Sequence, residues 1–380
     1  MAKIAIVAGL NRSLINFRGD LIKEWVSRGH EVLAIAPGEE VAEQVNALGA
    51  RYTTITLART GLSPVQDYET MRSLTAVFKA EKPDIVFLYT IKPVIYGSLA
   101  ASRAKVPEIY SMITGLGYIF SGDTLKHRLL KKTAIQLYKT ALQHNRTVLF
   151  QNPDDIQTFS SYGILSGQHK VVQVNGSGVN TNWFTPAPLP PRPIAFLLIA
   201  RLLWDKGIGE YIQAAREIKG KYPEVQFHLV GPYDENPSAI SKEDIEHWQK
   251  ERLIDYHGRV EDVRPFIKQA SVYVLPSYRE GTPRTVLEAM SMGRPIITTD
   301  APGCRETVQE GVNGFLVPIK DSRALARAME RFINEPGIME EMGSQSRKIA
   351  EEKYDVHKVN SVILEAMGLS NARWNKARIK

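Results

Sequence analysis

Short apolar runs that alternate with amphipathic segments restrict the fold of this chain more than any other feature. The runs are rich in β-branched residues and apolar on both faces, as expected of strands buried in a parallel sheet. In the first half of the chain they are KIAIVA, EVLAIA, DIVFLY, EIYSMI and TVLFQN, and helical patterns lie between them at 14–28, 67–81, 94–104 and 125–145. Strands that alternate with helices predict βαβ units and therefore an α/β fold.

A proline-rich segment interrupts this alternation at residues 184–193, where five of the ten residues are proline. Proline cannot donate to a sheet and breaks helices, so we interpret the segment as a linker. Beyond it the alternation resumes with IAFLLIA, VQFHLVG, LIDYHG, VYVLPS, PIITT and GFLVP. We therefore predict two doubly wound, Rossmann-like domains, 1–185 and 186–354, and a helical tail of about 355–380 that packs back on the first domain.

The predicted architecture also indicates where a ligand would bind. A chain of 380 residues is long enough for two domains of about 150 residues or more. Doubly wound sheets bind ligands at the carboxyl ends of their strands. We expect the two domains to face each other across a cleft that holds the substrate.

Cysteine use and the lengths of the apolar runs bear on location. The single cysteine, Cys304, excludes a disulfide within the chain, which favours a reducing, cytoplasmic setting. We expect its thiol to be a small buried hydrophobe rather than a nucleophile. The apolar run from Ile4 to Leu10 is too short for a signal peptide, and no stretch approaches the roughly 20 apolar residues of a membrane span.

Positive charge is concentrated in two places. The net charge is +7, and residues 121–150 hold six Lys or Arg and one Asp, while the last fifteen residues hold four cations and no acid. Clustered cations indicate an anionic partner: nucleic acid, phospholipid or a phosphorylated ligand. No nucleic-acid reading module accompanies the charge, so we expect no nucleic-acid partner.

The stretch REGTPRTVLEAM, residues 279–290, has the character of a phosphate-binding turn. It follows a predicted strand that ends near Ser277. Thr282 is a plausible N-cap and Pro283 suits the first helical position, so we expect a helix from Pro283 to about Met292. The free N–H groups and the positive dipole end of this helix favour an anion, and Gly281 permits close approach to the backbone.

Two glutamates flank this turn. Glu280 precedes the helix, and Glu288 lies roughly 7–8 Å along its axis from Pro283, at about 1.5 Å per residue. Carboxylates accept hydrogen bonds from sugar hydroxyls, so one glutamate could hold a ribose and the other a second sugar. That arrangement suits a nucleotide-diphosphate-sugar, although an isolated pair with this spacing would more often be two solvated side chains.

Two cations follow the first strand of the second predicted domain, in ARLLWDKGI. Arg201 and Lys206 could neutralise a diphosphate leaving group, or could belong to an ordinary charged loop. The sequence holds no D-x-D pair, no H-x3-H and no histidine cluster, so we expect no metal site. Neither TGLGYIF nor NGSGVNTN completes a dinucleotide fingerprint, and no P-loop is present.

Taken jointly, these motifs resemble the retaining glycosyltransferases of family 4, which adopt the GT-B architecture. The resemblance spans most of the chain and is carried by REGTPRTVLEAMSMGRPIITT, the Arg201–Lys206 element, LVGP at 229–232 and GSGVNTNWFTP at 176–186. It implies that Glu280 contacts the donor hexose, Glu288 binds the ribose, and Arg201 and Lys206 bind the pyrophosphate. The rest of the implied phosphate cradle is Gly281, Thr282, Pro283, Arg284 and Thr285.

The motifs EGTPR, SMITGLGYIF and KPVIYGSLAA are similar to those of one bacterial branch of that family, which extends undecaprenyl-diphosphate-linked sugars. The resemblance implies that the first domain binds the acceptor, for which Asn11, Arg12 and Arg18 are candidates, with a solvated loop as the alternative. Many relatives carry a histidine after the fifth strand of this domain. Here Thr114 holds that place, and the loop with Gly115 and Gly117 could contact the acceptor instead.

Residues 125–142, LKHRLLKKTAIQLYKTAL, form a basic amphipathic helix in this prediction. An apolar stripe of Leu125, Leu129, Leu130, Ala134, Leu137, Tyr138 and Ala141 is flanked by Lys126, Arg128, Lys131, Lys132 and Lys139. Such a helix can lie in an anionic lipid interface, or can pack on the core with a solvated face. We favour the interface, at the inner face of the cell membrane.

The function implied by the resemblance is retaining, metal-independent transfer of a hexose from a UDP-sugar to a polyprenyl-diphosphate-linked saccharide during bacterial surface-glycan or glycoprotein-glycan assembly. An N-acetylhexosamine such as GalNAc is the expected sugar, and no cofactor is expected besides the donor substrate. The alternatives are a UDP-sugar 2-epimerase of the same architecture and a non-catalytic nucleotide-sugar-binding scaffold.

Overall fold

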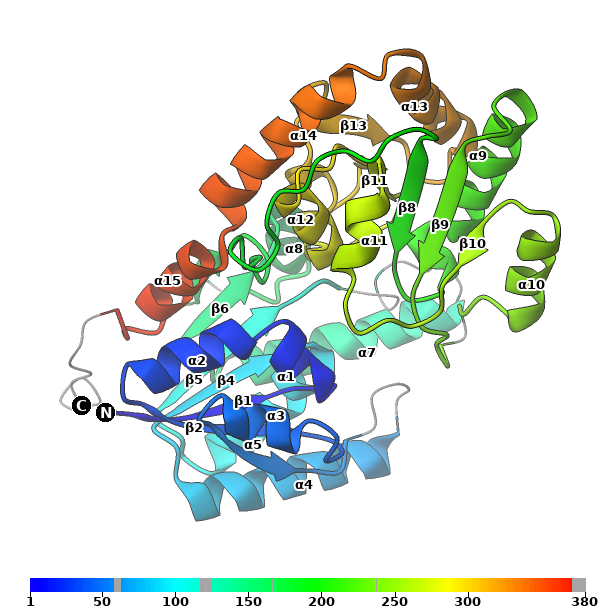
Figure 1. Ribbon diagram of the computed structural model, residues 1–380. Helices are drawn as coiled ribbons and strands as arrows, with labels where there is room; N and C mark the ends of the chain where they lie inside the picture. Colours follow the sequence, from blue (N-terminus) through cyan, green and yellow to red (C-terminus); the bar gives the residue numbers. More distant parts are fainter. Residues whose placement is uncertain are drawn as a thin grey trace. The chain divides into compact units, whose positions relative to one another are not determined.

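The computed structural model describes residues 1–57, 63–116, 120, 125–165, 167, 169–236 and 238–370 (Figure 1). The chain divides into two compact units. Unit 1 comprises Met1–Ser177 and the segment from Val356 onward, and unit 2 comprises Gly178–Asp355. Each unit is a parallel sheet flanked by helices, so the predicted α/β class is confirmed.

Unit 1 contains a seven-stranded sheet of order β3-β2-β1-β4-β5-β6-β7, and every pair of neighbours is parallel. The direction of winding reverses between β1 and β4, as in other doubly wound sheets. The strands are β1 (Lys3–Val7), β2 (Glu31–Ala36), β3 (Arg51–Thr54), β4 (Ile85–Tyr89), β5 (Glu108–Ile113), β6 (Thr147–Phe150) and β7 (Lys170–Gln173).

Helices cover both faces of this sheet because alternate strand residues point to opposite sides. Ile4 and Ile6 pack with Trp25 and the carboxyl-terminal helix, whereas Ala5 and Val7 pack into a second core on the other face. The helices are α1 (Arg12–Asn16), α2 (Gly19–Ser27), α3 (Ala42–Ala47), α4 (Pro64–Glu81), the π-helix η1 (Pro93–Gly97), α5 (Ser98–Arg103), α7 (Leu125–Leu142), α8 (Pro153–Ser161) and α15 (Val356–Ala366).

The carboxyl-terminal helix α15 belongs to unit 1 although it follows unit 2 in the sequence. Its buried Val359, Ile363 and Leu364 share a core with Trp25 of α2, and α2 and α15 lie on one face of the sheet in Figure 1. The Tyr110 hydroxyl on β5 donates to the carbonyl of Met367 beyond the helix (3.3 Å). The predicted tail beyond residue 370 lies outside the described residues.

Two local features of unit 1 differ from the prediction. The helix expected at 14–28 is two helices, since the chain breaks at Phe17–Arg18 and Arg18 turns into the interior. Strands β3 and β7 were not predicted. Both are edge strands whose residues are only partly buried, so neither shows the continuous apolar run of an interior strand.

Unit 2 contains a six-stranded parallel sheet of order β10-β9-β8-β11-β12-β13. Its strands are β8 (Ala195–Ile199), β9 (Gln226–Val230), β10 (Asp255–Tyr256), β11 (Val272–Leu275), β12 (Ile296–Thr299) and β13 (Gly314–Val317). Its helices are η2 (Trp204–Lys206), α9 (Ile208–Lys221), α10 (Lys242–Lys250), α11 (Arg264–Gln269), α12 (Arg284–Ser291), η3 (Arg305–Thr307), α13 (Ser322–Asn334), α14 (Ile338–Ile349) and the π-helix η4 (Ala350–Tyr354).

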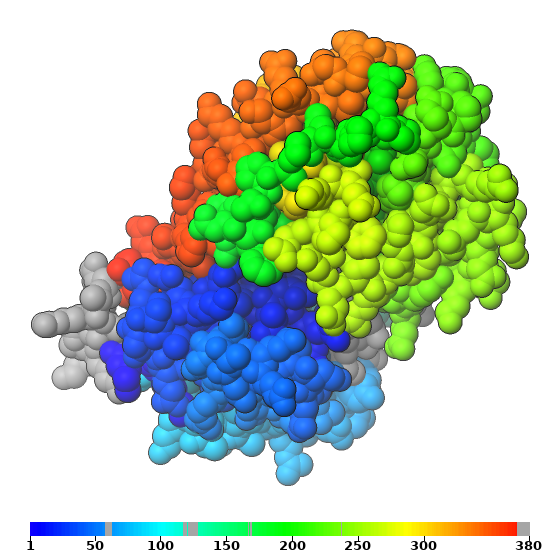
Figure 2. Space-filling model, viewed as in Figure 1, coloured from blue at the N-terminus to red at the C-terminus, as the bar shows by residue number. Residues whose placement is uncertain are grey.

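The proline-rich segment is bound to unit 2 and is not a free linker, which corrects our interpretation. The buried guanidinium of Arg294 donates to the carbonyl of Ala187 (3.1 Å) and to that of Pro188 (2.9 Å). Prolines lack an N–H but keep their carbonyls, so an arginine can hold such a segment. The segment runs along unit 2 and is coloured green in Figures 1 and 2.

The chain passes between units at Ser177–Gly178, earlier than the expected position near 185.

Candidate active site

The carboxyl ends of four neighbouring strands in unit 2 bring most of the predicted chemistry together. Strands β9, β8, β11 and β12 are adjacent in that order. Their loops carry Arg201 and Lys206 after β8, Asp234 after β9, and Glu280 after β11, before helix α12 begins. This is the edge of a parallel sheet at which ligands bind.

Lys206 and Glu280 form an ion pair. The Nζ of Lys206 lies 2.5 Å from Oε1 of Glu280, and the two side chains are only 14% and 17% exposed. The two residues lie far apart in the sequence. The sequence indicated each of them as a candidate site residue but did not predict that they contact each other. In this structure each neutralises the other, so an anionic ligand at Lys206 would have to share or exchange that partner.

Arg201 has a different partner, which we did not predict. One of its terminal nitrogens lies 2.7 Å from Oδ2 of Asp234; the arginine side chain is 41% exposed, and the aspartate side chain is 6% exposed. The carboxylate is therefore fixed inside the loop after β9, and the guanidinium extends from it toward solvent.

Two glycines allow the loops of the site to approach one another closely. Gly207 (φ 71°) lies where a Cβ would collide with the carbonyl of Pro276, at the end of β11. Gly303 (φ 80°), after β12, lies where a Cβ would collide with the backbone carbonyl of Glu280. The Glu280 N–H also donates to the carbonyl of Pro302 (2.9 Å). The backbone of Glu280 is thus held from the β12 side.

The helix after the turn begins one residue later than predicted. Pro283, not Thr282, is the N-cap of α12, with an extended ψ of 110° and no side-chain cap, and Arg284 is the first helical residue. Because proline has no N–H and favours φ near −65°, it suits the boundary as well as the first turn. The helix ends at Ser291, close to the predicted end at Met292.

A buried tyrosine connects the start of α12 to strand β8. The Tyr273 hydroxyl on β11 donates to Oγ1 of Thr285 (2.6 Å), and Thr285 donates in turn to the carbonyl of Ile199 (3.3 Å). Burial raises the pKa of Tyr273, so the hydroxyl stays a donor. The sequence carried no signal for this role, because a tyrosine in a buried strand is ordinarily a core residue.

Glu288 lies on α12 and is buried. Its Oε1 accepts from Nε of Arg284, one turn earlier, at 2.8 Å. Burial raises the pKa of Glu288, and the neighbouring Arg284 opposes that shift. A buried carboxylate with one cationic partner retains acceptor capacity for further donors, such as sugar hydroxyls.

The candidate residues of unit 1 occupy different environments. The Asn11 side chain caps α1 by accepting from the Arg12 N–H (2.7 Å), and its amide donates to Glu40. Arg18 is buried, 5.0 Å from the centre of the Tyr89 ring, with one nitrogen 2.8 Å from the Met112 sulfur. Asn11 and Arg18 thus contribute to packing, whereas Arg12 is exposed.

The loop after β5 is described only in part. Thr114 and Gly115 are partly exposed, and Gly115 adopts a φ of 110°, which favours glycine. Gly117 lies outside the described residues. The expected role of this loop at the acceptor therefore stays a prediction.

Helix α7 differs from the surface that we expected. Ala134, Tyr138 and Ala141 of the predicted stripe are buried, and the last two belong to a core of unit 1, with the Tyr138 ring 5.0 Å from that of Phe159. The stripe therefore cannot lie in lipid along its whole length. Leu129 is 69% exposed, so an apolar contact remains available near the start of the helix.

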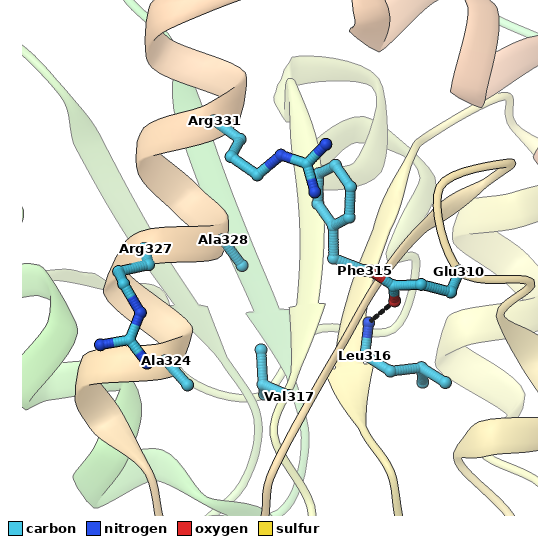
Figure 3. A pocket seen from close by; sticks show the side chains of 8 residues that line it. All are labelled: Glu310, Phe315, Leu316, Val317, Ala324, Arg327, Ala328 and Arg331. Atoms are coloured by element: carbon cyan, nitrogen blue, oxygen red, sulfur yellow. Dashed lines mark hydrogen bonds between the residues drawn. The ribbon is translucent and has the colours of Figure 1, made fainter.

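Other features lie apart from these loops. A hollow of about 380 Å³ between β13 and α13 contains none of the predicted site residues, and there the Arg331 guanidinium lies 3.9 Å from the centre of the Phe315 ring (Figure 3).

Among the described residues, no three His, Cys, Asp or Glu side chains are grouped as metal ligands. None of the described helices is both long and apolar enough to span a bilayer.

Comparison with protein families gives two matches that follow one another along the chain. Residues 16–202 match the model of the glycosyl transferase 4-like domain, and residues 193–335 match that of the glycosyl transferases group 1. Together the models cover most of both structural units.

Two curated relatives act on lipid-linked sugars, according to their names. The chain is 27% identical over 347 residues to the N,N'-diacetylbacillosaminyl-diphospho-undecaprenol alpha-1,3-N-acetylgalactosaminyltransferase of Campylobacter jejuni, covering 88% of this chain and 90% of that one. It is 27% identical over 290 residues to the UDP-Gal:alpha-D-GlcNAc-diphosphoundecaprenol alpha-1,3-galactosyltransferase of Escherichia coli, covering 73% of each.

Among solved structures, the chain is similar to HepE of Anabaena in complex with UDP and glucose. The TM-score is 0.77 at 18% sequence identity, with 97% of this chain and 100% of that chain covered. The likeness confirms the predicted GT-B fold.

Proposed function

We propose, from the premise that the chain belongs to the glycosyl transferases with a 4-like domain and a group 1 domain, that it transfers a hexose from a UDP-sugar to a saccharide carried on a polyprenyl diphosphate. Membership of this family confirms the resemblance predicted from the sequence. The observation that carries the proposal is that Arg201, Lys206 and Glu280 lie in loops at one edge of the unit 2 sheet, where Lys206 contacts Glu280 just before α12 begins.

The donor would bind through its diphosphate. Arg201, Lys206 and the positive dipole end of α12 supply positive charge where the leaving group gains negative charge. In this proposal Gly281, Thr282, Pro283, Arg284 and Thr285 line the phosphate cradle. The Glu288 carboxylate accepts from the ribose hydroxyls, and Glu280 lies on the sugar side of the diphosphate.

The reaction would proceed with retention of the anomeric configuration. The bond between the anomeric carbon and the diphosphate oxygen breaks through an oxocarbenium-like state, the UDP oxygen keeps the electron pair, and an acceptor hydroxyl attacks from the same face. Glu280 stabilises the developing positive charge in this proposal. Cationic side chains and helix N–H groups provide the charge that a divalent ion would otherwise supply, so we propose a metal-independent reaction.

The names of the two relatives support a lipid-diphosphate acceptor, and one of them supports N-acetylgalactosamine as the transferred sugar. We assign the acceptor to unit 1, where Arg12 is exposed after β1. Such an acceptor lies at a membrane surface. We propose peripheral contact at the inner face of the cell membrane through the exposed side chains of Arg128, Leu129 and Lys132 on α7.

A transfer assay tests this function. The purified protein is incubated with UDP-GalNAc or UDP-GlcNAc and a short polyprenyl-diphosphate-linked saccharide, and the product is identified by mass spectrometry and its anomer by NMR. We expect transfer with retention, unchanged by EDTA, and a loss of about 10²-fold or more in kcat for Lys206→Ala. Glu251→Gln, at an exposed ion pair in unit 2, is the control.

Three results would contradict the proposal in different ways. Conversion of UDP-GlcNAc without any acceptor, with ManNAc as a product, would indicate the 2-epimerase. Binding of UDP with no transfer to any acceptor, and unchanged cellular glycan in a Glu280→Ala strain, would indicate a scaffold. Loss of activity in EDTA, restored by a divalent ion, would overturn metal independence alone.

A further inference from the structure

We propose that Asp234 is a positioning residue that holds Arg201 in place for the donor diphosphate; this inference rests on the proposed function. The two residues leave neighbouring strands, since Arg201 follows β8 and Asp234 follows β9. They meet at 2.7 Å between a terminal guanidinium nitrogen and Oδ2. No other carboxylate in the described chain forms an ion pair with Arg201.

The aspartate is itself held by its own loop. Its Oδ1 accepts from the backbone N–H of Asn236 (3.0 Å), and the Asn236 side chain accepts from the N–H of Ser238 (3.0 Å). The carbonyl of Ser238 accepts from the N–H of Trp204 (3.0 Å), in the same loop as Arg201. The carboxylate is therefore a fixed point that is attached to both loops.

The backbone supports the same arrangement at the base of the two loops. Gly231 (φ 153°) lies where a Cβ would collide with the carbonyl of Ala200, so β9 exits directly beside the residue before Arg201. Farther along, the Ile240 N–H donates to the carbonyl of Leu202 (2.9 Å). Asp234 thus lies in a loop that is paired with the Arg201 loop on both sides of the contact.

The remaining guanidinium donors are what a diphosphate needs. Arginine carries five N–H donors in a rigid fork, and Asp234 accepts at only one terminal nitrogen. A long side chain that is anchored at one corner loses less freedom when it binds phosphate. The same carboxylate also repels phosphate. If Asp234 is removed, the loss of positioning should weaken diphosphate binding, whereas the loss of repulsion should strengthen it. We expect the loss of positioning to dominate.

The test is a double-mutant cycle with two readouts, UDP affinity by titration calorimetry and kcat and KM in the transfer assay. We expect Asp234→Ala to lower kcat/KM by roughly ten- to a hundredfold, mostly in kcat, and to weaken UDP binding. Asp234→Asn, which keeps an acceptor oxygen, should retain more activity. In an Arg201→Ala background, Asp234→Ala should change either readout by less than about twofold.

Thermal unfolding shows that each variant is folded, and Glu251→Ala, at the exposed pair with Arg216, is the matched control. An equal loss from Asp234→Ala with and without Arg201 would overturn the inference, since the aspartate would then act independently of the arginine. Unchanged or tighter UDP binding by Asp234→Ala, with unchanged turnover, would overturn it as well. A wild-type protein that binds no UDP would overturn the proposed function, and this inference with it.

Discussion

At the residue scale, the candidate site is a set of cations that are each matched to a carboxylate. Lys206 pairs with Glu280 and Arg284 with Glu288. These pairs keep partly buried charges compensated, because an uncompensated buried charge is costly. On the proposed function, donor binding replaces these ion pairs: the diphosphate binds the cationic side chains, and the sugar hydroxyls donate to the carboxylates.

The buried Glu288 predicts a pH dependence of nucleotide binding. Its pKa is raised above the ordinary 4.5 by burial, and the ionised carboxylate accepts from ribose hydroxyls more strongly than the protonated carboxyl does. UDP affinity should therefore fall as the pH falls through this raised pKa. The pH dependence of folding stability has the opposite sign. Because the pKa of Glu288 is higher in the folded state than in the unfolded state, its contribution to stability is present below the unfolded-state pKa and is lost as the pH rises through the folded-state pKa.

Calorimetric titration of UDP from about pH 5 to about pH 8 measures this dependence. In Glu288→Gln the acid-side loss should disappear and the affinity should be lower throughout. Glu251→Gln, at a surface pair, should keep the wild-type profile. If Glu288→Gln kept the same acid-side loss, another group would have to be responsible.

At the element scale, one buried arginine joins three segments of unit 2. Arg294, directly before β12, donates to carbonyls of the proline-rich segment and, through Nε, to Ile267 of α11 (2.9 Å). Burial lowers the pKa of Arg294 to about 10, so it remains charged at neutral pH. Its N–H groups hydrogen-bond to carbonyls of a segment whose prolines have no backbone N–H to donate.

Removing this side chain should destabilise unit 2. We expect Arg294→Ala to lower the free energy of unfolding by about 3 kcal/mol, because several buried carbonyls lose their donor and a cavity remains. Arg216→Ala, at an exposed pair with Glu251, should cost less than about 1 kcal/mol. Urea unfolding followed by circular dichroism measures both, and equal midpoints for the two variants would contradict the role of Arg294.

At the scale of the whole molecule, the distribution of exposed charge bears on where the protein acts. Lys131 lies 4.8 Å from the centre of the Tyr162 ring, so it takes part in packing within unit 1. Arg128 and Lys132 are exposed beside Leu129. The membrane contact that we propose therefore uses less than the full helix and is made by Arg128, Leu129 and Lys132.

Vesicle binding tests this smaller surface. The triple variant Arg128→Gln, Leu129→Gln and Lys132→Gln should bind vesicles with anionic phospholipid several-fold more weakly than the wild type, and the difference should narrow at high salt. Arg323→Gln with Lys250→Gln removes two exposed cations of unit 2 as a control. Sedimentation with vesicles measures binding, and equal loss in both variants would show that net charge alone is responsible.

The sequence by itself determined the α/β class, the interior strands and several residues of the candidate site. These are local patterns: apolar runs bounded by turns, the Glu280 and Glu288 spacing, and cations placed directly after a strand. In a parallel sheet the carboxyl ends of strands share one edge, which is why residues that the sequence indicated separately, after different strands, lie at the same edge of the unit 2 sheet.

Only the tertiary structure decided which partner each of these residues has. Asp234 reaches Arg201 because β9 and β8 are neighbours, Arg294 holds the proline-rich segment, Arg18 turns inward onto Tyr89, and half of α7 packs into the core. The edge segments β3 and β7 become strands through their hydrogen bonds to β2 and β6. Each outcome depends on contacts between residues far apart in the chain, and such contacts leave no periodic pattern in the local sequence.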